Sequence, residues 1–113
     1  MNRPYLHYPH PRPRPLPGDI FPGIFPWDPL RLQPRQEVLI YPYIGGAFNA
    51  ELLTAHHYPH IGSLPDYAFL WATNSVQIAQ ARLQLAKHFS VDYDIKRTPF
   101  GLYTFQRLPL IAH

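Results

Sequence analysis

Residues 63–89 read SLPDYAFLWATNSVQIAQARLQLAKHF, and this stretch gives the strongest secondary-structure signal in the chain. Ser63 belongs to the residue types that cap helix N-termini, and Asp66 suits the positive end of a helix dipole. Lys87, with the histidine after it, suits the negative end. The pattern therefore predicts one long helix from about Leu64 to Phe89.

The predicted helix carries apolar side chains on two faces. Seven residues fall within a stripe about 100° wide, which is the usual core face: Tyr67, Leu70, Trp71, Ile78, Ala81, Leu85 and Phe89. Phe69, Val76 and Leu83 follow one another at intervals of seven and fall nearly opposite. A helix on one side of a small sheet needs only one apolar stripe, so we expect the second to meet the preceding chain or a partner. The alternative is that these are three scattered surface side chains.

The segments on either side of the helix predict a small α+β body spanning residues 36–113. The run of strand-forming residues at 37–41 predicts a strand that Pro42 ends or confines to a sheet edge. Residues 47–54 suggest a short helix.

A β-hairpin is expected after the long helix. Residues 91–95 alternate apolar and polar side chains, residues 102–106 return, and TPFG at 98–101 favours a type I turn between them. The body thus reads as strand, loop, one long helix and C-terminal β-hairpin.

The first 35 residues have a different composition and predict an extended proline-rich arm. Ten of the 15 prolines and the whole net charge of +3 lie in this third of the chain. Proline at every second position from 9 to 17 favours extended backbone without internal hydrogen bonds. The near repeat Ile-Phe-Pro at 20–22 and 24–26 places large apolar groups on this backbone. Such a segment is expected to lie on a surface, either on its own body or on another chain, and the remaining alternative is plain disorder.

The arm supplies the remaining candidate binding residues. We expect Phe21, Phe25 and Trp27 to contact a partner together with the second helix face. Arg12 and Arg14 are expected to contact an acidic or phosphate-bearing surface.

Histidines are the weak candidates for a metal site. His56, His57 and His60 lie close together, and His57-Tyr58-Pro59-His60 repeats the tetrapeptide at 7–10. Imidazole nitrogens bind zinc or nickel, but proline within the motif argues against a shared helical face. We therefore expect ordinary loop histidines and no cofactor.

Several classes of function lack their sequence signals. The chain has no cysteine, which excludes disulfides, thiolate nucleophiles and cysteine-ligated metals. It shows no nucleophile elbow, phosphate loop or dinucleotide fingerprint. It also lacks a signal-peptide-like start and an apolar run of membrane-spanning length. We expect no enzyme, no secretion by a cleaved signal and no membrane partner.

A weakly charged, aromatic chain with a small core is suited to assembly. The expectation is a structural or accessory subunit of a multisubunit particle, with a virion or phage particle favoured, that docks through its body and tethers neighbours with its arm. Its location would then be a virion or the cytoplasm. The alternative is a small basic nucleic-acid-binding protein that uses arginine and aromatic side chains of the arm.

Overall fold

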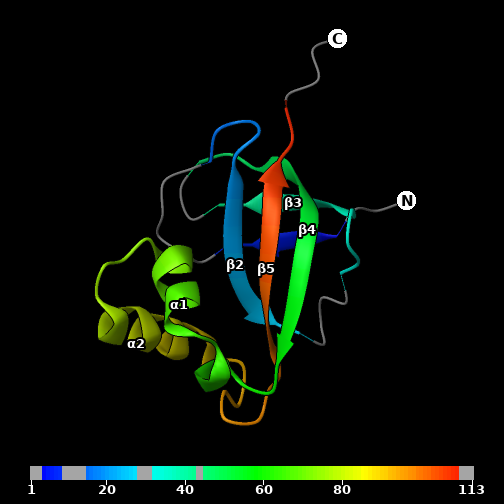
Figure 1. Cartoon of the computed structure of the whole chain (residues 1–113). Helices are drawn as coiled ribbons and strands as arrows, with labels where there is room; N and C mark the ends of the chain where they lie inside the picture. Colours follow the sequence, from blue (N-terminus) through cyan, green and yellow to red (C-terminus); the bar gives the residue numbers. More distant parts are fainter. Residues whose placement is uncertain (1–3, 9–14, 28–31, 43–44, 110–113) are drawn as a thin grey trace.

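The computed structural model describes residues 4–8, 15–27, 32–42 and 45–109. These residues form a mixed α+β fold, which confirms the expected class. In chain order the elements are β1 (Tyr5–His7), β2 (Ile20–Pro26), β3 (Glu37–Tyr41), β4 (Phe48–Tyr58), the 3₁₀ turn η1 (Ile61–Ser63), α1 (Asp66–Thr73), α2 (Ile78–Phe89) and β5 (Phe100–Arg107). Figure 1 shows the two helices on one side of the sheet, beside β2.

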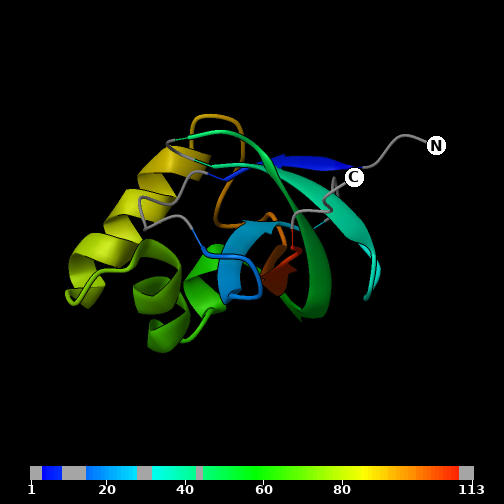
Figure 2. The same ribbon diagram turned by 90° about the horizontal axis from the view of Figure 1, so that it is seen from above.

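The strands form one curled sheet with the order β1-β3-β4-β5-β2. β1 pairs with β3 in parallel, and the other pairs are antiparallel. β3 and β1 cross behind β4, β5 and β2 (Figure 1), and the view from above separates the same two layers (Figure 2). The curl brings the two edge strands, β1 and β2, close together. As a result, the hydroxyl of Tyr8, the residue after β1, donates a hydrogen bond to the Pro22 carbonyl of β2.

The described part of the first third does not form the expected extended arm. β1 and β2 lie in the same sheet as the strands of the predicted body, so a boundary near Gln36 separates no structural unit. The radius of gyration, 13.7 Å, is close to the value of about 13 Å for a compact chain of this length. Residues 20–26 are held in the sheet because every residue of β2 pairs with a residue of β5.

The prolines of β2 are compatible with a strand because β2 is an edge strand. The Trp27 amide, just after β2, donates to the Pro99 carbonyl on the β5 side. Neighbouring residues of a strand direct their backbone groups to opposite sides. Pro22 and Pro26 therefore stand at positions that face away from β5, where a missing N–H removes no bond of the ladder.

Aromatic side chains fill the inside of the curled sheet. Phe21 on β2 stacks on Phe105 of β5 at 5.4 Å between ring centroids. It also meets Phe48 of β4 and Tyr8 edge-on, each at 5.7 Å. Residues from four separate stretches of the chain thus share one core, and β2 contributes its centre.

The strand expected at 37–41 is confirmed as β3, but the short helix expected at 47–54 is wrong. Residues 48–58 form β4, which pairs with β3 on one side and β5 on the other. Phe48, Ala50 and Leu52 are buried in alternation, which is the pattern of a strand with one face in the core. Pro42 ends β3, which is an interior strand.

The single long helix is also wrong, since α1 and α2 are separate. Asn74 adopts the left-handed conformation, with φ of 56°, and its amide closes the end of α1 on Leu70 and Trp71 carbonyls. Asparagine tolerates this conformation, which stops a helix. The Ser75 hydroxyl then accepts a hydrogen bond from the Gln77 amide at 3.1 Å. Polar residues at 73–75 therefore break the helix where periodicity alone predicts continuation.

The expected C-terminal hairpin is absent from the described residues. Its second strand exists as β5, but β5 pairs with β4 and β2 and has no free side left for residues 91–95. Those residues form turns, in which the Tyr93 amide bonds to the Phe89 carbonyl and the Thr98 amide to the Asp94 carbonyl.

Candidate functional site

The aromatic residues predicted to contact a partner from the arm lie in or against the core. Phe21 is 2% exposed and Phe25 is 4% exposed, which corrects the expectation that they present an outer surface. Trp27 is half-buried and stacks on Tyr103 at 5.7 Å, with His57 edge-on at 5.1 Å. The repeat at 20–26 explains the arrangement. A spacing of four is even, so it places Phe21 and Phe25 on the same face of a strand.

The two arginines predicted to contact acidic groups, Arg12 and Arg14, lie outside the described residues. The described residues on either side of them belong to β1 and to the turn before β2.

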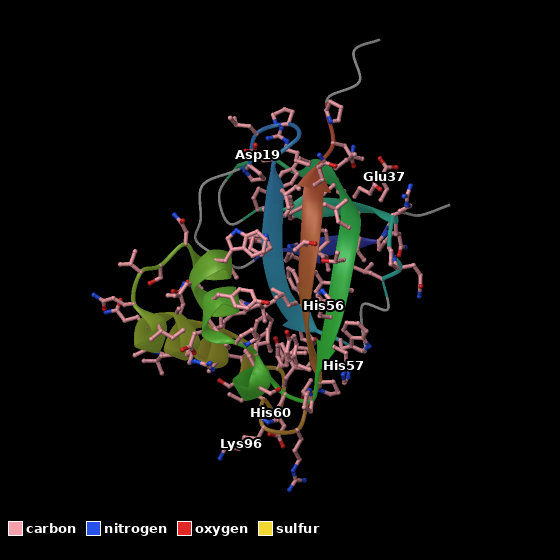
Figure 3. All side chains as sticks on the ribbon, viewed as in Figure 1. Asp19, Glu37, His56, His57, His60 and Lys96 are labelled. Carbon is pink, nitrogen blue, oxygen red and sulfur yellow. The ribbon has the colours of Figure 1, made fainter. Side chains whose placement is uncertain are left out.

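The histidines do not gather into a metal site. His56 and His57 are neighbours on β4, in register with Leu102 and Gly101 of β5, so they lie on opposite faces of the sheet. His60 follows the end of β4 and lies beyond both of them (Figure 3). Among the described residues no three histidine, cysteine or acidic side chains are placed to share a metal ion.

The second apolar stripe predicted for the helix divides into a buried part and an exposed part. Phe69 is 1% exposed, and the guanidinium carbon of Arg82 lies 4.3 Å from the centroid of the Phe69 ring. The assignment of Phe69 to an outer face is therefore wrong. Val76 is 94% exposed and Leu83 is 68% exposed. The break after α1 causes the difference, because it turns α1 independently of α2.

The surface that remains is one face of α2 together with the loop before it. We call it the helical face, and it consists of exposed residues that lie on one side of α2 or just precede it: Val76, Gln80, Leu83, Gln84 and Lys87. Lys87 is its only charged side chain. Arg82 lies outside it and is held by Asp66, with Nη2 and Oδ1 at 2.6 Å. The helical face is therefore uncharged except at one end.

A pocket of about 310 Å³ lies on the neighbouring face of α2. Its walls come from η1, both helices and the turn before β5: His60, Ile61, Gly62, Phe69, Arg82, Ala86, Ile95 and Lys96. Figure 3 shows His60 and Lys96 together at this end of the molecule. The walls are almost entirely apolar, and the charge of Arg82 is already paired with Asp66, so the pocket can admit a small apolar group.

No helix in the described ranges is long and apolar enough to cross a bilayer. In comparisons with known proteins, no family model, curated protein or solved structure matches this chain. The function is therefore inferred from the geometry of the chain itself.

Proposed function

We propose that this protein is a non-enzymatic structural or accessory subunit of a multisubunit assembly, and that a second copy of the chain binds its helical face. A particle of the virion type is the setting that the composition favours. The observation that carries the proposal is the exposure of Val76 (94%) and Leu83 (68%) on a face with a single charge.

Exposed apolar side chains on a helix lose contact with water when a partner covers them. Fully burying a valine or leucine side chain contributes about 1.5–3 kcal/mol. Glutamine side chains at positions 80 and 84 can supply hydrogen bonds around them. Charged residues are depleted at the centre of protein interfaces, and the helical face has none at its centre.

A second copy fits this face because a two-fold interface places the same patch on both sides. In an antiparallel arrangement of two α2 helices, Leu83 of one copy lies near Gln80 of the other. Lys87 then lies near Val76 of the other copy, and its aliphatic stem covers that side chain while its ammonium group reaches water. The two lysines stand at opposite ends, so like charges do not meet.

This proposal does not use the first third of the chain as a tether between subunits, which was the role expected from the sequence. Tethering a neighbour with residues 20–26 would require removing β2 from the sheet and exposing Phe21 and Phe25. The proposed contact uses the folded surface instead.

The test is the oligomeric state of the full chain by size-exclusion chromatography with light scattering. Leu83→Glu should weaken self-association by about tenfold or more, because it places a charge in an apolar contact. Leu16→Glu is the matched control, since Leu16 is also 68% exposed but precedes β2. A monomeric wild-type chain, or equal association of the two variants, contradicts the proposal.

A further inference from the structure

The pocket on the neighbouring face of α2 is large enough for a small ring compound. Its volume of about 310 Å³ lies at the lower end of the range of about 300–1,000 Å³ that is typical of small-molecule sites. An apolar cavity of about 150 Å³ already admits benzene. The pocket therefore has room for a molecule of one or two rings.

Small residues on two of the lining elements leave this space open. Gly62 of η1 has no side chain, and Ala86 of α2, which is half-buried, contributes a single carbon. Ile61 is buried and Ile95 is half-buried, and both add apolar wall. Because Ala86 itself lines the pocket, a longer side chain at this position would extend into it.

Arg82 lines the pocket as a fixed plane whose charge is already matched. Its Nε and Nη2 donate to Asp66 Oδ1 at 3.1 and 2.6 Å, and Nη2 also donates to the Leu64 carbonyl at 3.1 Å. Nη1 donates to the Gly62 carbonyl at 3.5 Å. These bonds lie near the guanidinium plane, so they fix its orientation and leave its faces for stacking. The second cation of the lining, Lys96, is exposed and solvated.

Two flat groups in the lining favour an aromatic ligand. Phe69 supplies a ring, and the guanidinium carbon of Arg82 lies 4.3 Å from the centroid of that ring. An aromatic molecule gains from contact with another ring and from contact with the face of a guanidinium. A saturated ring of the same size gains neither. The pocket should therefore bind aromatic molecules more tightly than saturated ones.

We propose that this pocket binds a small uncharged aromatic molecule of one or two rings. The ligand contacts Phe69 and Arg82, and the apolar walls at Ile61, Ala86 and Ile95 enclose it. None of these residues belongs to the helical face, so the site stands or falls separately from the proposed association.

Benzyl alcohol is the probe, and cyclohexylmethanol is its saturated counterpart with the same hydroxymethyl group. Binding to the full chain is followed by two-dimensional amide NMR. We expect benzyl alcohol to shift the Gly62 and Ile95 amides in a saturable way. It should bind about threefold or more tightly than cyclohexylmethanol, because only the aromatic ring gains from Phe69 and Arg82.

A cavity-filling variant locates the binding. Ala86→Leu fills the pocket and leaves the other lining residues in place, so it should weaken benzyl alcohol binding by about tenfold or more. Ala79→Leu is the matched control, because Ala79 lies two turns earlier on the same side of α2 but is exposed and outside the pocket. This control should bind benzyl alcohol as the unchanged chain does.

Three results would overturn the site: no saturable shifts with benzyl alcohol, equal or tighter binding of cyclohexylmethanol, or equal benzyl alcohol binding by folded Ala86→Leu and Ala79→Leu chains. Loss of self-association in Ala86→Leu, without benzyl alcohol shifts in the unchanged chain, would instead assign the pocket to a side chain of a second copy. If Ala86→Leu does not fold, nuclear Overhauser effects in the unchanged chain decide. We expect them between the ring protons of benzyl alcohol and the methyl groups of Ile61 and Ile95, and their absence refutes the proposal.

Discussion

Replacing Phe21 by alanine tests whether the proline-rich first third belongs to the core. The Phe21 ring is 2% exposed and lies among Phe105, Phe48 and Tyr8. A partner-binding residue on an extended arm would have few such contacts in the isolated chain. A core residue would lose all of them at once.

The expected loss of stability is about 3–5 kcal/mol, which is the range for truncating a buried phenylalanine to alanine. The upper half of that range applies here. The stacked pair with Phe105 and the edge-on contacts with Phe48 and Tyr8 each add about 0.5–1.5 kcal/mol beyond burial. Small domains have a total stability of about 5–15 kcal/mol, so the variant should be barely stable.

Urea unfolding followed by far-UV circular dichroism measures this loss. Leu16→Ala is the control from the same third of the chain, because Leu16 is 68% exposed. Its free energy of unfolding should change by no more than about 0.5 kcal/mol. If Phe21→Ala is as stable as Leu16→Ala, the Phe21 ring does not pack in the core and the sheet order is wrong.

Two further substitutions test the local geometry. A Cβ at Gly101 would lie 2.6 Å from the Trp27 ring, so Gly101→Ala should lose about 1–3 kcal/mol in urea unfolding; Gly46→Ala, with nothing within 4 Å, should lose little, and equal losses would refute the packing of Trp27. Asn74 holds φ of 56°, so Asn74→Ala should lower the free energy of unfolding by about 1–2 kcal/mol while Asn74→Gly should be nearly neutral in thermal unfolding. A continuous helix would instead be stabilised by alanine over glycine.

The sequence predicts the fold class and the strands at 37–41 and 102–106 correctly, and it misses other elements for identifiable reasons. β3 is found because its five residues are strand formers bounded by a proline. β2 is missed because its prolines count against a strand unless the strand is known to be an edge. That knowledge depends on the pairing with β5, which is 80 or so residues away in the chain and leaves no local signal.

The helix break and the absence of a strand at 91–95 show the same limit. The periodicity of residues 64–89 continues through Asn74, whereas the backbone does not. The polar triplet at 73–75 is the signal that was available. The alternation at 91–95 resembles a strand. However, β5 pairs with β2 on one side and with β4 on the other, so neither side is left for residues 91–95. Competition between strands for the same partner is a tertiary effect.

The candidate surfaces were partly visible in the sequence. Val76 and Leu83 follow from helical periodicity. Phe69 has the same spacing but lies on a different helix, so its prediction fails with the break. The pocket on the neighbouring face of α2 carries no signal in the sequence, because η1, the two helices and the turn before β5 come together only in the fold.

Amide hydrogen exchange of the full chain at low and high protein concentration tests the proposed association most directly. Peptides covering residues 76–91 and residues 20–26 are compared by mass spectrometry. Association through the helical face predicts protection that rises with concentration at 76–91 and stays constant at 20–26. Concentration-dependent protection at 20–26, or none anywhere in the chain, would contradict it.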